Sequence, residues 1–208
     1  YNYIAIEGNI GVGKTSFATM LANRYNARLI LEQFEDNAFL AKFYENPAKY
    51  AFPLELSFLA ERYQQLQKDL NQQELFSSFT VSDYFINKSL IFARKTLQDD
   101  EFFLFKKLFE IINAKLPKPD LLVHLYVGVQ RLQKNIKNRG RDYEQNIPDT
   151  YLEQIQSSYF DYIKQQPGLR ILLVDISNMD FVANPEDFNT LTGLVHKDYP
   201  TGINYINL

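Results

Sequence analysis

Cysteine is absent from this chain of 208 residues, and histidine occurs only twice, as His124 and His196. A chain without cysteine has no disulfide bond, thiolate nucleophile or cysteine-ligated metal. Two histidines are too few for a histidine-rich metal site. No apolar run approaches the roughly 18 residues that span a membrane, and the first residues lack the pattern of a secretory signal. The sequence therefore predicts a cytoplasmic protein with no membrane partner.

Strong charge of either sign is also lacking. The chain has 22 Lys and Arg residues against 25 Asp and Glu residues, a net charge of −3. A weakly negative overall field does not suit a protein that grips duplex nucleic acid, so we expect no nucleic-acid partner. Hydrophobic residues make up 46% and charged residues 23%, which is typical of a globular protein rather than a disordered one.

Short apolar runs alternate along the chain with helical patterns. We expect strands at residues 3–6, 27–31, 78–82, 121–127 and 171–175. We expect helices at residues 37–70 (with a break near Asn46-Pro47), 85–95, 101–116, 129–137 and 150–165. This alternation predicts an α/β fold with a central parallel sheet of about five strands and helices on both faces. We expect one domain over residues 1–192 and an irregular tail over residues 193–208.

One motif between the first strand and the first helix carries chemistry. Residues 8–15 read GNIGVGKT and match the complete P-loop pattern G-x-x-x-x-G-K-[ST]. Glycines in such a loop let backbone N–H groups approach phosphate oxygens, the lysine reaches the β- and γ-phosphates, and the hydroxyl binds Mg²⁺. The predicted ATP-binding residues are Gly8, Asn9, Ile10, Gly11, Val12, Gly13, Lys14 and Thr15.

A P-loop magnesium site usually needs a carboxylate at the end of another strand. Asp83 directly follows residues 79–82 and is the preferred candidate; Asp175 ends another apolar run and is its rival. Helix capping is the alternative role for Asp83. We therefore expect Mg²⁺ to bind together with ATP at Thr15 and Asp83.

Four further segments resemble deoxynucleoside kinases. They are residues 6–11 (IEGNIG) with the strand-ending Glu32, residues 43–52 (FYENPAKYAF), residues 139–148 (RGRDYEQNIP), and Asp175 followed by Asp180-Phe181. The resemblance runs in order over about residues 3–190. It implies a P-loop kinase fold and a homodimer. It also implies ATP-dependent phosphorylation of the 5′-hydroxyl of a purine deoxynucleoside to the 5′-monophosphate, for nucleotide salvage.

The resemblance also implies individual roles. Glu32 would be the general base for the 5′-hydroxyl. Lys14 and the arginines of the lid, residues 139–148, would neutralise charge on the transferred phosphoryl group. The remaining assignments are Arg139 and Arg141 as those lid arginines, Tyr44 and Glu144 at the sugar 3′-hydroxyl, and Asp180 and Phe181 at the adenine of ATP.

The chain departs from the family pattern after the third strand. The family places an arginine directly after the acidic residue, whereas Tyr84 follows Asp83 here. Lys88 or Arg94 from the next helix could replace that arginine. If neither does, the chain would be a nucleotide-binding module with little catalysis. A nucleoside monophosphate kinase is another alternative, although few basic residues are available to hold an acceptor's phosphate.

A second departure concerns the base pocket. The family reads the nucleobase with a helical Gln and an Arg seven residues later, and the matching residues here are Glu55 and Arg62. A carboxylate only accepts hydrogen bonds, and guanine presents two adjacent donors, N1–H and N2–H₂. Glu55 therefore favours a guanine-like base, unless it is occupied by an internal ion pair with Arg62 or Lys88.

Overall fold

The computed structural model describes residues 1–33, 37–71 and 77–208. The chain divides into two compact units. The sheet unit comprises Tyr1–Leu31, Glu74–Tyr84 and Pro119–Leu208, and the helical unit comprises Glu32–Gln73 and Phe85–Lys118. The expected single domain over residues 1–192 stays a prediction.

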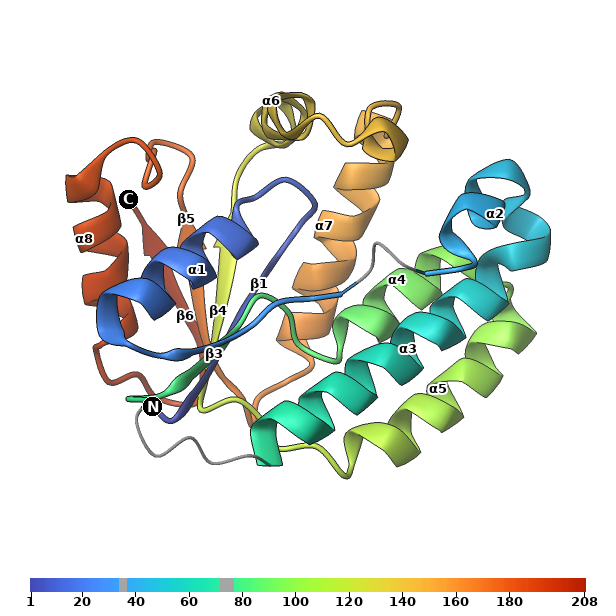
Figure 1. The fold of residues 1–208 in the computed structure, drawn as a ribbon, viewed down its shortest axis with the longest axis horizontal. Helices are drawn as coiled ribbons and strands as arrows, with labels where there is room; N and C mark the ends of the chain where they lie inside the picture. Colours follow the sequence, from blue (N-terminus) through green and yellow to red (C-terminus); the bar gives the residue numbers. More distant parts are fainter. Residues whose placement is uncertain (34–36, 72–76) are drawn as a thin grey trace. The chain divides into compact units, whose positions relative to one another are not determined.

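A parallel sheet of six strands forms the centre of the sheet unit, in the order β2-β3-β1-β4-β5-β6 (Figure 1). The strands are β1 (Tyr3–Gly8), β2 (Arg28–Ile30), β3 (Thr80–Ser82), β4 (Leu121–Tyr126), β5 (Arg170–Asp175) and β6 (Gly202–Asn207). β1 is central because it pairs with β3 on one side and β4 on the other. The carboxyl ends of parallel strands meet at one edge of the sheet, and ligands of open α/β sheets bind at this edge.

The prediction of an irregular tail was wrong, and the predicted five strands are six. Residues 202–207 form β6, which pairs in parallel with β5. Its side chains alternate between partly buried and exposed, with Ile203 45% and Tyr205 57% exposed. Such a half-exposed edge strand lacks the continuous apolar run that marks β4. Helix α8 (Pro185–Val195), which the sequence analysis did not predict, crosses the expected boundary at residue 193.

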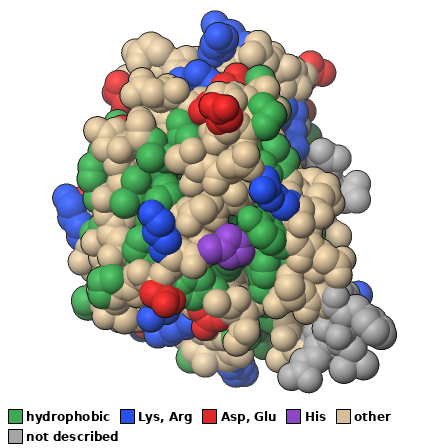
Figure 2. Space-filling view, turned by 90° about the vertical axis from the view of Figure 1, so that its left-hand side faces the viewer, with side chains coloured by type: hydrophobic (Ala, Val, Ile, Leu, Met, Phe, Trp, Pro, Cys, Tyr) green, Lys and Arg blue, Asp and Glu red, His purple; other side chains and the backbone are tan. Residues whose placement is uncertain are grey.

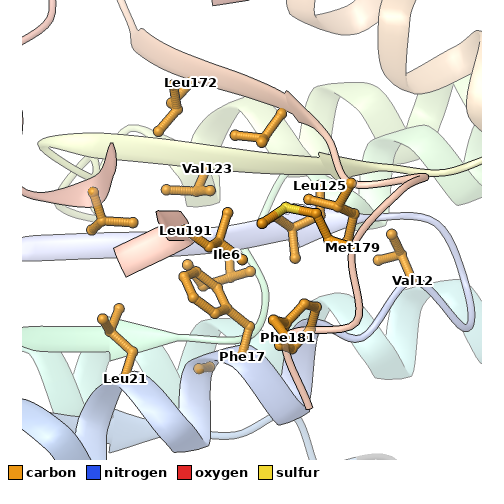
Figure 3. Close-up of a cluster of buried hydrophobic side chains, with 14 of the residues drawn as sticks. Ile6, Val12, Phe17, Leu21, Val123, Leu125, Leu172, Met179, Phe181 and Leu191 are labelled. Atoms are coloured by element: carbon orange, nitrogen blue, oxygen red, sulfur yellow. The ribbon is translucent and has the colours of Figure 1, made fainter. Parts of the chain in front are cut away.

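Helices cover both faces of the sheet, as predicted. On one face, α1 (Lys14–Tyr25) and α8 pack together, with the rings of Phe17 and Phe188 6.3 Å apart. Figure 3 shows Phe17 in a buried apolar cluster with Ile6 and Val123. Neighbouring strand residues point to the other face, where α7 (Asp149–Lys164) lies.

The face toward α7 contains buried polar groups. Tyr159 of α7 donates its hydroxyl hydrogen to Glu7 Oε2 at 2.9 Å, and its ring lies 5.0 Å from that of His124. Burial and the positive charge of Lys14 lower the pKa of His124 to about 3, so this imidazole is neutral. His124 is therefore part of the packing of the sheet.

The helical unit contains α2 (Leu40–Glu45), α3 (Pro47–Asn71), α4 (Lys88–Thr96) and α5 (Asp99–Asn113). The break expected near Asn46-Pro47 is confirmed, since α2 ends at Glu45 and α3 begins at Pro47. α3 packs against α2, α4 and α5. A capping box of Gln98 and Glu101 begins α5.

The surface is mixed in charge on the face that Figure 2 shows. Basic and acidic side chains are interspersed there among hydrophobic ones, among the residues that are coloured. Of the helices in the described ranges, none has both the length and the apolar character needed to cross a membrane.

Candidate functional site

The P-loop connects β1 to α1 at the carboxyl edge of the sheet. Lys14 is the first residue of α1, and its Nζ donates to the carbonyl oxygens of Gly8 and Asn9, both at 2.9 Å. Gly13 has φ +103°, and a Cβ there would lie 2.9 Å from Cζ of Phe181. This position therefore needs glycine for both its backbone conformation and its packing. The loop presents backbone N–H groups at the positive end of a helix, which is an anion-binding arrangement.

Thr15 and Asp83 meet beside this loop. Thr15 Oγ1 donates to Asp83 Oδ2 at 2.6 Å, and Asp83 is buried directly after β3, the neighbour of β1. A hydroxyl and a carboxylate are hard oxygen ligands that suit Mg²⁺, which takes its remaining ligands from water and nucleotide phosphates. Asp175, the rival, instead accepts a hydrogen bond from the N–H of Ser177 at 2.9 Å within the turn after β5. The donor set at Thr15 and Asp83 therefore fits the ion better.

In the described parts of the chain, no group of three or more His, Cys, Asp or Glu side chains could hold a metal ion. A magnesium ion would thus depend on the nucleotide for much of its coordination.

Both lid arginines meet at one carboxylate. Arg139 ends α6 (Val129–Arg139), and Glu144 lies in the 3₁₀ helix Asp142–Glu144. Arg139 donates from Nε to Glu144 Oε2 at 3.1 Å and also pairs with it through Nη2. Arg141 Nη1 lies 3.4 Å from Glu144 Oε1. Buried Glu144 therefore holds two guanidinium groups together, and a polyphosphate could compete with it for them.

The loop after β5 packs against the P-loop through Phe181. The ring of Phe181 is buried 5.6 Å from that of Phe17 and touches Gly13. Asp180 is exposed, and its carboxylate lies 3.9 Å from Nη2 of Arg131 on α6. The Phe181 ring is thus occupied by packing, and a contact with adenine would fall to the backbone of this loop or to exposed groups such as Arg131.

In the helical unit, Glu32 binds two cations. Arg62 of α3 donates from Nε to Glu32 Oε1 at 2.8 Å, and Lys88 of α4 lies 2.5 Å from Oε2. Burial raises the pKa of Glu32, but the ammonium of Lys88 and the guanidinium of Arg62 outweigh it and hold the pKa well below its usual range. Arg94 instead pairs with Asp99 at the surface. Of the two candidate replacements for the missing arginine, Lys88 is therefore the one that pairs with Glu32.

Glu55 lies two turns before Arg62 on α3 and is 3% exposed. Thr96 of α4 donates to its Oε1 at 2.8 Å. Within the described residues, Arg62 and Lys88 both pair with Glu32, and neither forms an ion pair with Glu55. Burial raises the pKa of Glu55 to about 7, although the Thr96 hydrogen bond opposes this shift. The side chain of Tyr44, the other predicted sugar contact, lies outside the described part of the structure.

The family assignment rests on comparison with known proteins. The family model described as "Deoxynucleoside kinase" matches residues 4–198. This chain belongs to the deoxynucleoside kinase family. The deoxyguanosine kinase of Bacillus subtilis is 39% identical over 197 residues, 93% of this chain and 95% of that protein. The deoxyadenosine kinase of Dictyostelium discoideum is 32% identical over 189 residues, 88% of this chain and 75% of its own length.

A solved structure of another family member gives the same fold. The deoxyadenosine kinase from M. mycoides with bound dATP superposes with a TM-score of 0.80 at 19% identity, over 94% of this chain and all of that one. The predicted P-loop kinase fold and the predicted class of enzyme, a deoxynucleoside kinase, are both confirmed.

Proposed function

We propose that this kinase transfers the γ-phosphate of MgATP to the 5′-hydroxyl of deoxyguanosine, for nucleotide salvage in the cytoplasm. The observation that carries the choice of base is the buried carboxyl of Glu55, which accepts one hydrogen bond from Thr96. Two relatives named deoxyguanosine kinase, from Bacillus subtilis and Lactobacillus johnsonii, are 39% and 31% identical to this chain and support it.

On the donor side, the P-loop holds the triphosphate. Lys14 would leave the carbonyl oxygens of Gly8 and Asn9 to bind the β- and γ-phosphates. Thr15 and Asp83 would hold Mg²⁺, which when bound would supply positive charge beside the phosphates. Arg139 and Arg141 then exchange the Glu144 carboxylate for phosphoryl oxygens, a task that suits the guanidinium fork.

On the acceptor side, Glu32 orients the nucleoside. Its lowered pKa keeps the carboxylate ionised at neutral pH but also makes it a weak proton acceptor. The transition state of phosphoryl transfer is loose, so the attacking hydroxyl needs positioning more than early deprotonation. We therefore assign Glu32 the role of accepting a hydrogen bond from the 5′-hydroxyl, with the hydroxyl proton passing to this carboxylate late in the reaction, as the bond to the γ-phosphorus forms and ADP leaves.

Glu55 selects the base. Ionised, its carboxylate accepts from N1–H and N2–H₂ of guanine together; adenine offers one donor and one acceptor at the same edge. Because both cations nearby are bound to Glu32, Glu55 needs no competing ion pair to break before it binds a base. Arg62, beside Glu32, would contact the base from the same helix. Tyr44 and Glu144 remain the proposed partners of the sugar 3′-hydroxyl.

Catalysis is favoured over a nucleotide-binding module without turnover. The main argument for a binding module without turnover is the absence of an arginine directly after Asp83. The ammonium of Lys88 lies 2.5 Å from Glu32 and supports the proposal that Lys88 replaces the positive charge of that arginine.

The test is ATP consumption with Mg²⁺ against the four deoxynucleosides, with Glu32→Gln as the control. We expect turnover to be fastest on deoxyguanosine and to fall strongly in the control. Clear ATP binding with no turnover on any nucleoside would refute the catalytic proposal. Faster turnover on deoxyadenosine would refute only the choice of base.

We further propose that the enzyme is a homodimer that packs through α5. Phe103, Leu104 and Ile111 on this helix are 60%, 51% and 61% exposed. Residues 104 and 111 are seven apart, so they share a face of the helix, and large apolar side chains exposed on one face favour a subunit interface. A second copy of the chain would bury it isologously. Light scattering on the purified protein tests this; a monomer at micromolar concentration would contradict it.

A further inference from the structure

Two asparagine side chains tie the P-loop to the helices on either side of the lid. Asn135 of α6 donates from Nδ2 to the carbonyl oxygen of Gly11 at 2.8 Å. Asn9 donates from Nδ2 to the carbonyl oxygen of Leu152 on α7 at 2.8 Å and accepts from the N–H of Ile10 at 2.8 Å. Figure 1 shows α6 and α7 next to the turn between β1 and α1. The loop that holds the phosphates is thus bonded to both helices that carry the lid.

Close packing reinforces the contact with α6. Gly11 has φ +81°, and a Cβ there would lie 2.9 Å from both Cγ1 of Ile136 and the carbonyl oxygen of Leu132. The P-loop backbone at Gly11 therefore packs closely on α6, against the backbone of Leu132 and the side chain of Ile136. A shift of the loop has to move this helix or break the Asn135 hydrogen bond, since packed interiors have little free space.

The spacing along α6 connects this contact to catalysis. Arg139 follows Asn135 by four residues, one helical turn, so both lie on the same side of the helix. Asn135 is therefore placed to set the distance between the phosphate-binding backbone and the first lid arginine. Asn9 fixes the same loop to α7, on the other side of Arg141 and Glu144.

We propose that Asn135 and Asn9 are positioning residues that couple the P-loop to the lid, so that Arg139 is held in register with the phosphates of bound ATP. This inference rests on the proposed role of Arg139 in phosphoryl transfer. Neither asparagine side chain needs to touch the transferred group. Their effect acts through the helices, and it should appear in kcat more than in the affinity for ATP.

The experiment is a double-mutant cycle between Asn135→Ala and Arg139→Ala. Alone, Asn135→Ala should lower kcat about five- to tenfold, the size expected for one lost hydrogen bond, with the Kd for ATP within about twofold of wild type. In the Arg139→Ala background the same substitution should cost less than about twofold, because its effect acts through that arginine. Asn135→Leu, which keeps the volume, should behave like the alanine variant.

A matched control lies on the same helix. Asn138 is exposed, and its side chain makes no hydrogen bond to the described residues, so Asn138→Ala should retain wild-type kcat. An equal loss from Asn135→Ala with and without Arg139, or a weaker Kd with normal kcat, would overturn the coupling. Wild-type kcat in Arg139→Ala would instead refute the proposed role of the lid arginine.

Discussion

Protonation of Glu55 should change which base the enzyme prefers. Deprotonated, the side chain is a double acceptor and suits guanine; protonated, it has one donor and one acceptor, like a glutamine amide, and suits adenine. Burial raises its pKa to about 7, against the Thr96 hydrogen bond and the positive charges of Arg62 and Lys88. The change therefore falls within the pH range where the enzyme can be assayed.

The magnitude follows from the buried groups. If the side chain presents the wrong hydrogen-bonding pattern, a buried donor or acceptor is left unpaired, which costs about 1–3 kcal/mol, or roughly five- to 150-fold in kcat/KM. The ratio of kcat/KM for deoxyguanosine to that for deoxyadenosine should rise by this factor from about pH 6 to about pH 8. The assay is initial rates of both nucleosides across this range at saturating MgATP.

Two variants identify the group that titrates. Glu55→Gln should favour deoxyadenosine at every pH. Thr96→Val removes the hydrogen bond that lowers the pKa, so it should move the midpoint of the change to higher pH. A constant ratio in the wild-type enzyme, together with an unchanged ratio in Glu55→Gln, would refute this account of base selection.

Five other predictions concern the kinetics, metal binding, stability and assembly of the enzyme. Lys88→Met should lower kcat about tenfold or more and raise the pKa of Glu32, which a pH–rate profile in the acidic range measures. Because the folded-state pKa of Glu32 is lowered, its contribution to stability is present above its ordinary value of 4.5 and is lost as pH falls below it, as urea titrations at falling pH would reveal. Asp83→Asn should raise the Mg²⁺ concentration needed for half-maximal rate, and no change in a Mg²⁺ titration would exclude it as a ligand. Phe181→Ala should destabilise the fold by about 3–5 kcal/mol in denaturant unfolding and also weaken ATP binding, because the ring supports Gly13. Ile111→Glu should convert the proposed dimer to a monomer without unfolding it, as light scattering and circular dichroism would show.

Sequence patterns predicted the elements whose signals are local. The run before the P-loop, the apolar run of β4 and the break at Pro47 are all visible within a few residues, and each is present in the structure. β6 was missed because an edge strand alternates in polarity and depends on β5 for its pairing. α8 had a start signal in Asn184, whose side chain accepts from the N–H of Glu186, and Pro185, but the sequence analysis did not weigh it.

The candidate site likewise contains residues that local sequence segments mark and contacts that only the structure reveals. The P-loop and the two arginines, Arg139 and Arg141, lie in contiguous segments, so sequence alone could mark them as candidates. The structure adds that Glu144 contacts both arginines. The partners of Glu32 come from α3 and α4, far apart in sequence, and only the structure distinguishes Lys88 from Arg94. The ring of Phe181 is packed against Phe17, which a loop motif cannot reveal.

The central position of β1 governs the order in which the chain can fold during synthesis. β1 is synthesised before both of the strands that it pairs with in the described structure, β3 at residues 80–82 and β4 at residues 121–126. Until β4 is synthesised, the apolar strand β1 and the P-loop that follows it lack one of the two neighbouring strands of β1. Non-local parallel pairing of this kind is slow, and it leaves hydrophobic segments exposed in the interval. Translation speed and chaperone supply should therefore influence the yield of active enzyme as much as its final stability does.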